Sequence, residues 1–311
     1  MARRRYLPPD LELAHVSFKC VGDAFLMRPD PYTNFVIACA LVDGIERYGV
    51  RLYAFCFLSN HSHLLVGILG CRLDSFMQYV KSRIALALNE HRERDGAFFK
   101  RRYRVEPILS DDAAGGVEQY VHQQPVKHGL VERSVEWPGL SSFEAIVAGK
   151  PSVDVEWFDE QAWREAGACR GERADFVQRV SVPLTPLPHR QGLSALELRA
   201  QRRALVMNMQ DFESSAARKR RDDGNHRRLP KPSSYATQDP NGMPARTGRK
   251  ARTPQPWAHG TDEQVAAYRE AYELVMNAYE IASARYRKTG QLCPFPAGTF
   301  PPRIPIPLEV V

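Results

Sequence analysis

Residues 50–66 read VRLYAFCFLSNHSHLLV and hold two apolar segments on either side of a short polar stretch. The first segment, Val50 to Leu58, is almost wholly apolar and short, which is typical of a buried strand. The polar stretch, residues 59–63, leads into a second apolar segment, Leu64 to Val66, which we also expect to be a strand. These residues therefore predict two consecutive strands of one sheet, with His61 and His63 where the second one begins.

Patterns on both sides of this stretch predict the rest of the domain. Residues 15–20 alternate between apolar and polar side chains, as a strand does. Apolar residues at helical spacing predict helices over residues 32–48 and 73–94, and a shorter helix over residues 111–124. This order of elements is typical of a small antiparallel sheet with helices packed on one face. We therefore predict an α+β fold.

The composition changes along the second half of the chain. We predict a domain over residues 1–145 and a mixed helical extension over residues 146–213. Residues 214–255 hold eleven basic and three acidic side chains among Pro, Ser and Gly, so we predict a basic flexible linker over residues 214–260. Residues 261–311 are predicted to form an amphipathic helix and a proline-rich tail. The extension as a whole is thus predicted to be mostly helical and partly disordered.

The composition also limits the class of partner. The chain has 311 residues and a formal net charge of +7, which favours an anionic partner such as nucleic acid. None of the six cysteines forms a CxxC pair, so no structural zinc site is expected. The N-terminus lacks the apolar core of a signal peptide and no window is apolar enough to span a membrane, so we expect no membrane partner and a cytoplasmic location.

The two histidines of residues 50–66 are candidate metal ligands. Alternate side chains of a strand share a face, so His61 and His63 project side by side. Two imidazoles on one rigid strand can bind a divalent ion, and Asn60 could orient one ring through a hydrogen bond. The alternative is a pair of partly exposed surface histidines. The HxH pattern alone does not decide between the two, and the surrounding sequence does.

Residues 57–66, FLSNHSHLLV, resemble the MxNHxHLL signature of the REP-associated tyrosine transposases, relatives of the HUH-type transposases of the smallest insertion sequences. The resemblance continues in four further segments: residues 73–89, FFKRRY at 98–103, YVHQQPVKHGLV at 120–131, and WPGLSS at 137–142. The five segments follow the family's order and spacing and cover roughly residues 15–145.

The resemblance implies a ferredoxin-like sheet and a metal-dependent reaction on DNA. It implies that His61, His63 and a third polar ligand hold Mg²⁺ or Mn²⁺, which polarises the scissile phosphate of single-stranded or hairpin DNA. Position along the sequence favours Asn89 as the third ligand, with Gln78 as the alternative. A tyrosine of the long helix then attacks the phosphate and leaves a 5′-phosphotyrosyl link and a free 3′-hydroxyl.

The position expected for that tyrosine holds a different residue. We match it to the position five residues before Asn89, which is Ile84. The nearest tyrosine, Tyr79, lies five positions earlier and points about 140° away around the helix. Tyr79 is therefore either a displaced nucleophile or an aromatic side chain packed at the edge of the helix. Two smaller departures from the family pattern are Ser62 and Gln124, where a bulky apolar residue and an asparagine are usual.

A compact basic cluster follows the second long helix. The predicted DNA-binding residues are Lys100, Arg101, Arg102, Tyr103 and Arg104. Positive charges contact phosphates and aromatic rings stack on unpaired bases, which is what binding of a single strand requires. The alternative is a solvated charged turn.

Three functions remain open on these observations. The first is an active transposase that cleaves and joins single-stranded DNA in the transposition of a mobile element. The second is a catalytically inactive or domesticated relative that binds DNA, and the third is a metal-dependent nuclease that uses water as its nucleophile. Ile84 favours the second and third, whereas the five matching segments favour the first. The resemblance allows either a monomer or a homodimer.

Overall fold

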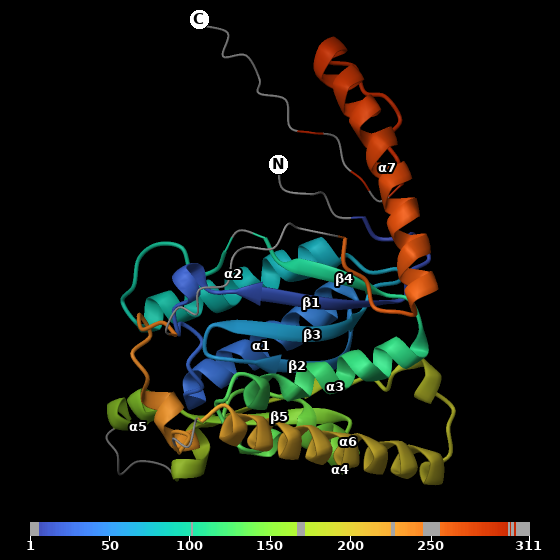
Figure 1. Cartoon of the computed structure of the whole chain (residues 1–311). Helices are drawn as coiled ribbons and strands as arrows, with labels where there is room; N and C mark the ends of the chain where they lie inside the picture. Colours follow the sequence, from blue (N-terminus) through green and yellow to red (C-terminus); the bar gives the residue numbers. More distant parts are fainter. Residues whose placement is uncertain are drawn as a thin grey trace, which may run out of the picture.

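A four-stranded antiparallel sheet forms the centre of the N-terminal domain (Figure 1). The computed structural model describes residues 6–100, 102–166, 172–224, 228–244, 256–297, 299 and 302. The strands are β1 (Leu13–Lys19), β2 (Arg51–Phe57), β3 (His61–Gly67) and β4 (Arg104–Ile108), in the order β2-β3-β1-β4. This is the strand order of a ferredoxin-like sheet, so the predicted α+β fold is confirmed.

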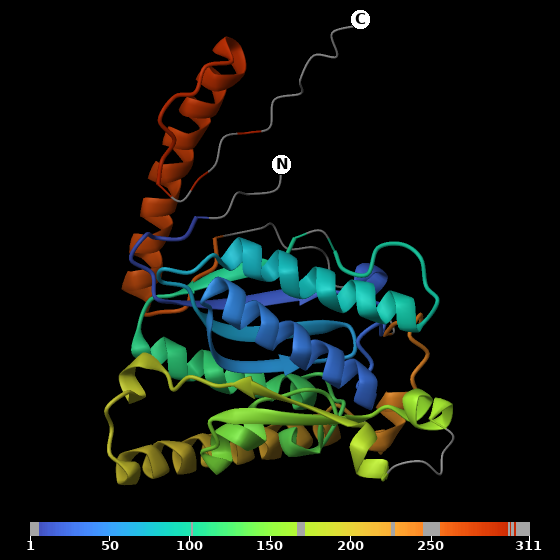
Figure 2. The same ribbon diagram turned by 180° about the vertical axis from the view of Figure 1, so that it is seen from behind.

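Helices cover both faces of the sheet, and not one face as predicted. On one face, α1 (Pro31–Tyr48) and α2 (Leu73–His91) pack as predicted, and Figure 2 shows them in front of the strands. Their apolar side chains form the larger core with inward residues of the sheet such as Leu64 and Val66. The opposite face carries α3 (Asp111–Lys127), whose apolar residues pack on Leu65 and its neighbours. The sheet therefore separates α1 and α2 from α3.

The ends of α1 follow from its sequence. Asp30 precedes the helix, and its carboxylate accepts a hydrogen bond of 2.7 Å from the backbone N–H of Thr33, which satisfies one free donor of the first turn. Pro31 stands at the first helical position, where no N–H is needed. Gly49 ends the helix with a φ of 67°, a left-handed conformation that glycine adopts without strain. These signals place α1 within one residue of its predicted bounds.

The fourth strand, β4, was not predicted. Its sequence, RVEPI, contains Pro107, and a proline inside a short run argues against a strand. The structure resolves the conflict by placing β4 at the edge of the sheet, where a missing N–H costs no ladder bond. The other side of β4 is extended by a distant residue, because His259 donates its N–H to the Pro107 carbonyl (2.8 Å) and accepts from the Leu109 N–H (2.7 Å).

A two-stranded ribbon lies against α1. It consists of β5 (Ser152–Phe158) and β6 (Val177–Pro183), which pair antiparallel. The helices of this region are α4 (Phe143–Ala148), α5 (Glu160–Glu165) and α6 (Ala195–Asp222), and α6 packs on α3 and α4. A mixed helical extension was predicted for this region. The two-stranded ribbon was not predicted.

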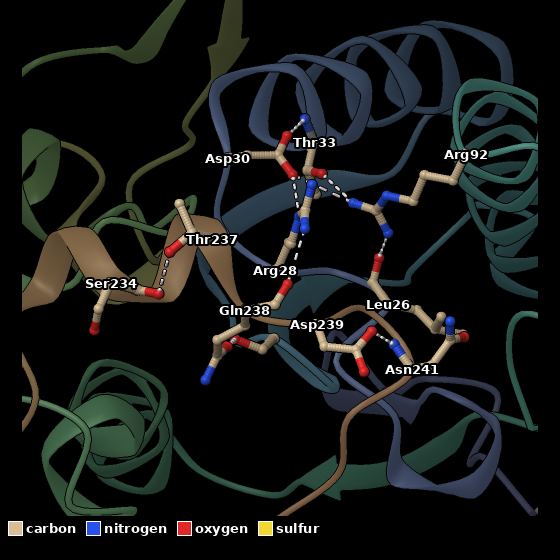
Figure 3. Close-up of polar contacts among 11 residues, drawn as sticks. Leu26, Arg28, Asp30, Thr33, Arg92, Ser234, Thr237, Gln238, Asp239 and Asn241 are labelled. Atoms are coloured by element: carbon tan, nitrogen blue, oxygen red, sulfur yellow. Dashed lines mark hydrogen bonds and ion pairs between the residues drawn. The ribbon is translucent and has the colours of Figure 1, made fainter.

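Parts of the predicted flexible linker are docked where the structure describes them. The first nine residues of residues 214–260 belong to α6. Tyr235 is buried and donates its hydroxyl proton to the Leu130 carbonyl at 2.6 Å. Figure 3 shows Gln238 beside the start of α1, where its carbonyl accepts a bond of 2.8 Å from Arg28. Residues 225–227 and 245–255 lie outside the described part of the chain.

The last long helix, α7 (Asp262–Thr289), projects from the domain in both views (Figures 1 and 2). Near its start, Tyr268 stacks on Tyr6 with ring centroids 6.2 Å apart. Near its end, the chain turns back and Phe295 packs against Tyr279. α7 lies within residues 261–311, the range for which the amphipathic helix and proline-rich tail were predicted. Among the helices that the structure describes, none is long and apolar enough to span a membrane.

We expect Gly44→Ala to lower the free energy of unfolding by about 1–3 kcal/mol, because extra atoms in a tight core force strain. A β-carbon at Gly44 would lie 2.9 Å from side-chain atoms of Phe76 and Val80, where α1 crosses α2. Urea unfolding followed by circular dichroism measures the change. Gly116→Ala is the control, since its β-carbon meets nothing within 4 Å, and there we expect a gain of up to about 1 kcal/mol. Equal losses in both variants would contradict the close approach of α1 and α2.

Candidate functional site

His61 and His63 lie on the face of the sheet that α3 covers. Each is only 8% exposed, so the alternative of two surface histidines is wrong. Asn60 holds the first ring as predicted, since its Oδ1 atom lies 2.6 Å from Nδ1 of His61. Asn60 is itself fixed, because its amide donates to the carbonyl of Asp23 at 3.1 Å. The pair is therefore rigidly held between the sheet and α3.

One stripe of α3 lies across the histidines. Tyr120, Gln124 and His128 are spaced four residues apart and so share one side of the helix and its C-terminal cap. The Tyr120 ring centroid is 5.5 Å from that of His63, and the His128 centroid is 4.9 Å from that of His61. Gln124 stands between these two contacts and is 1% exposed. The stripe therefore brings a phenol, an amide and a third imidazole to the histidine pair.

Two further contacts complete this side of the site. The amide nitrogen of Gln124 donates to the Tyr120 carbonyl at 2.8 Å, and its amide oxygen is the atom of that side chain that can ligate a metal. The ammonium of Lys127 lies 4.2 Å from the Tyr120 ring centroid. A cation at that distance interacts favourably with the ring and supplies positive charge next to the phenol.

A buried polar network continues from His63 into β1 and β4. Nδ1 of His63 lies 2.9 Å from Nε2 of His15, and Nδ1 of His15 lies 2.9 Å from Oε2 of Glu106. The same carboxylate oxygen lies 2.9 Å from Nε2 of His259, and Arg104 pairs with the other oxygen at 2.7 Å. Burial raises the pKa of Glu106, but the hydrogen bonds from the two histidines and the charge of Arg104 outweigh it and hold the pKa well below its usual range.

The electrostatics of the site keep the histidine pair neutral. Burial, followed by electrostatic repulsion from the neighbouring His128 and Lys19, lowers the pKa of His61 to about 3. Burial, followed by the neighbouring His15, lowers the pKa of His63 well below its usual value. Near neutral pH both imidazoles therefore keep the lone pair that a metal ion requires.

Residues 37–124 match the family model described as "Transposase IS200 like". This segment is similar to the IS200-like transposases. A protein of Haemophilus influenzae assigned to the REP-associated tyrosine transposases is 30% identical over 110 residues. That alignment covers 32% of this chain and 61% of the relative, so the chain spans about three fifths of the length of that relative. The matched segment includes His61, His63, Tyr120 and Gln124.

Two solved structures are also similar to the chain. One is a REP-associated tyrosine transposase bound to a REP hairpin, 18% identical, with a TM-score of 0.39 over 48% of this chain and 85% of that one. The other is a protein of Deinococcus radiodurans assigned as a transposase, 17% identical, with a TM-score of 0.28 over 40% of this chain and 98% of that one.

The fold does not bring Tyr79 or Asn89 to the histidine pair. Both residues belong to α2, on the opposite face of the sheet. The Tyr79 hydroxyl donates to Asp43 of α1 at 3.2 Å, and the Asn89 amide bonds to the Gly96 carbonyl at 3.1 Å. The structure therefore corrects both assignments, since α2 packs on the face of the sheet opposite to the one on which His61 and His63 lie.

The matched nucleophile position needs the same correction. Ile84 is fully buried in the core between α2 and the sheet. A side chain there cannot reach a phosphate in solvent, so position 84 cannot carry the nucleophile. The tyrosine next to the histidines is Tyr120 of α3.

The predicted DNA-binding residues of the N-terminal domain divide between two places. A groove of about 1190 Å³ runs along α2 and is lined by Lys100, Arg102 and Tyr103. Lys100 also pairs with Asp23 at 3.0 Å. Arg104 instead lies on the histidine face, where it contacts Glu106. Arg101 lies outside the described residues.

The groove holds further residues of the same chemical type. Arg72, Lys81 and Phe99 also line it, and the Lys81 ammonium lies 5.6 Å from the Phe99 ring centroid. The groove therefore combines positive charge with aromatic rings, as the sequence predicted for the cluster.

Sequence reasoning missed most of the residues around the histidine pair. Tyr120 and Gln124 stand in a segment already noted for its resemblance, and their four-residue spacing on a predicted helix was the available signal. His15 stands on the first predicted strand but carries no motif. Glu106 and His259 carry no local signal, because β4 was not predicted and His259 was assigned to a linker.

Proposed function

We propose that this chain is a transposase that binds single-stranded or hairpin DNA and cleaves it with Tyr120 as the nucleophile. We further propose that His61, His63 and Gln124 hold the Mg²⁺ or Mn²⁺ ion that the reaction uses. The observation that carries the proposal is the contact between the Tyr120 and His63 rings, whose centroids are 5.5 Å apart. A tyrosine and a pair of neutral imidazoles on one face are the groups that this chemistry requires.

The donor atoms suit a hard divalent ion. His61 and His63 offer neutral imidazole nitrogens, and Gln124 offers an amide oxygen from the facing helix. Mg²⁺ and Mn²⁺ accept such oxygen and nitrogen ligands and fill their remaining positions with water or substrate oxygens. When bound, the ion would polarise a phosphoryl oxygen and neutralise charge that builds up during the reaction.

Tyr120 would carry out the covalent step. Its Oη atom attacks phosphorus, the new O–P bond forms, and the bond from phosphorus to the 3′-oxygen breaks. The phenol loses its proton, and the leaving 3′-oxygen gains one to become a 3′-hydroxyl. The downstream strand then stays on Tyr120 through its 5′-phosphate, and attack by a 3′-hydroxyl reverses the step and joins the strands. Lys127, close to the ring, supplies positive charge for the phosphate.

We expect simultaneous Lys81→Ala, Lys100→Ala and Arg102→Ala substitutions to weaken DNA binding and to make the negative slope of log affinity against log salt shallower by about 2. Each phosphate contact on a single strand contributes about 0.7 to that slope, and all three side chains line the groove. Fluorescence anisotropy with a single-stranded oligonucleotide at several salt concentrations measures both quantities.

The matched control for the groove is Arg164→Ala with Arg179→Ala. Both arginines are exposed and pair with nearby glutamates in the extension, away from the groove. We expect the control to keep the slope of the unchanged protein. An unchanged slope in the groove variant would contradict the assignment of the groove to DNA.

A labelling experiment tests the proposed reaction. The full chain is incubated with a hairpin-bearing single strand and Mn²⁺, and the products are separated on a denaturing gel. A 3′-labelled strand should give a labelled protein adduct, whereas a 5′-labelled strand should give a shorter free fragment. EDTA should prevent both products.

The other hypotheses predict different gels. Cleavage without an adduct would identify a nuclease that uses water. Binding with neither product would identify a catalytically inactive DNA-binding relative. Either result would contradict the proposed role of Tyr120.

A further inference from the structure

The buried network behind His63 connects three parts of the chain that lie far apart in sequence. His15 comes from β1, Glu106 from β4, and His259 from the segment just before α7. Side-chain contacts of 2.9 Å join His63 to His15, His15 to Glu106, and Glu106 to His259. Among the described residues, His15 is the hydrogen-bonding partner of Nδ1 of His63.

The carboxylate of Glu106 determines where the hydrogens lie. An ionised carboxylate only accepts hydrogen bonds, so Nδ1 of His15 and Nε2 of His259 must each carry a hydrogen. A neutral His15 then has a lone pair on Nε2, and Nδ1 of His63 must donate to it. The lone pair of His63 is consequently on Nε2, the atom that remains for a ligand.

The ring geometry supports this bond between the two histidines. The planes of His15 and His63 differ by only 5°, and the ring centroids are 5.1 Å apart. The nearest nitrogens of the two rings are 2.9 Å apart. With centroids at 5.1 Å, two parallel rings can reach this distance only when they lie edge to edge. An N–H of one ring then lies close to the plane of the other, where the acceptor lone pair points.

Burial strengthens the hydrogen bonds of the network, and the positive charge of Arg104 helps to keep Glu106 ionised. His15 is 3% exposed and Glu106 is 9% exposed, and hydrogen bonds in such a low-dielectric interior are strong. Arg104 balances the negative charge of Glu106 from its other oxygen. The carboxylate therefore remains an acceptor for both histidines.

We propose that His15, Glu106 and His259 form a hydrogen-bonded relay that fixes His63 with its hydrogen on Nδ1 and so presents Nε2 to the divalent ion. The three are positioning residues, and the inference rests on the metal site of the proposed function. His259 is held by two backbone bonds to the edge of β4 and lies outside residues 37–124. The metal site of the transposase domain therefore depends on a segment from the C-terminal part of the chain.

The tautomer of His63 tests the relay without any metal. The full chain is labelled with ¹⁵N-histidine, and long-range ¹H–¹⁵N correlations identify which ring nitrogen carries the hydrogen. His63→Gln assigns the signal among the nine histidines. We expect His63 to carry its hydrogen on Nδ1. A hydrogen on Nε2 would overturn the relay.

Binding of Mn²⁺, followed by electron paramagnetic resonance, tests the consequence. Loss of an outer partner typically lowers metal affinity by about 10–100-fold, and we expect a loss in this range for Glu106→Leu. His259→Ala should give a smaller loss, and His259→Gln should restore affinity because its amide nitrogen can donate to Glu106. His91→Ala, an exposed histidine on α2, is the control and should not change affinity.

The binding data also separate the relay from two other outcomes. Three groups of the relay lie within 4.8 Å of one another and could themselves hold an ion. Binding that survives His61→Ala but is lost in His259→Ala would place the ion there and overturn the proposal. The expected tautomer without any Mn²⁺ binding would support the relay and overturn the metal site of the proposed function.

Discussion

Tyr120→Phe should abolish the covalent DNA adduct and lower strand cleavage by at least about 10³-fold, the order of loss seen when a nucleophile is removed. The substitution deletes one oxygen atom and keeps the ring that packs on His63 and His15. The fold and the histidine pair should therefore survive. Single-turnover cleavage of a labelled hairpin strand with Mn²⁺ measures the loss.

Tyr79→Phe is the matched control for this prediction. It deletes the same atom from the other candidate tyrosine, whose hydroxyl contacts Asp43 on the far side of the sheet. We expect both adduct and cleavage rate to stay at the level of the unchanged protein. An adduct that persists in Tyr120→Phe and disappears in Tyr79→Phe would reverse the assignment.

Arg190→Ala should lower the free energy of unfolding by about 3–5 kcal/mol, the cost of leaving a buried charge without its partner. Arg190 donates two hydrogen bonds, of 2.8 and 2.6 Å, to the carboxylate of Glu118. Glu118 is 2% exposed and stands on α3 two residues before Tyr120. Losing its partner should therefore destabilise the helix that carries the proposed nucleophile. Urea unfolding measures the change.

Two further variants separate the buried charge from other effects of the substitution. Arg133→Ala removes an arginine that pairs with Glu136 but is largely exposed, and we expect a loss of no more than about 1 kcal/mol. Arg190→Met combined with Glu118→Leu removes both charges and should recover most of the stability. A double variant as unstable as Arg190→Ala would show that the ion pair is not the cause.

Local patterns predicted the central sheet and its helices well. The apolar run before His61 and the apolar periodicity of residues 32–48 are enough to predict that these elements are buried, because apolar side chains pack away from water. β4 escaped prediction, since Pro107 is acceptable only at a sheet edge and the sequence does not reveal which strand will be at the edge. The alternating strand β5 was missed within a region assigned as helical.

The site was predicted only where one short segment carries it. His61 and His63 stand on one strand, so their shared face follows from strand geometry alone. The periodicity of a helix shows which of its sides is apolar, but it does not show which face of the sheet that side covers. The predicted nucleophile was therefore placed on α2. The position of Tyr120 beside His63 follows only from the packing of α3 on the sheet.

The relay could not be predicted because its contacts are long-range. His15 is 91 residues from Glu106, and Glu106 is 153 residues from His259. Strand register and the docking of the C-terminal segment bring them together, and neither has a local sequence signal. The hydrogen-bond geometry that orients His63 is thus a property of the tertiary structure.

Identification of the tyrosine that carries DNA is the most direct test of the account. After reaction of the full chain with a hairpin-bearing strand and Mn²⁺, nuclease and trypsin digestion leaves a short nucleotide on one peptide, which mass spectrometry identifies. Residues 105–127 form a tryptic peptide whose single tyrosine is Tyr120, and residues 73–81 form another whose single tyrosine is Tyr79. We expect the nucleotide on residues 105–127. A nucleotide on residues 73–81 would contradict it.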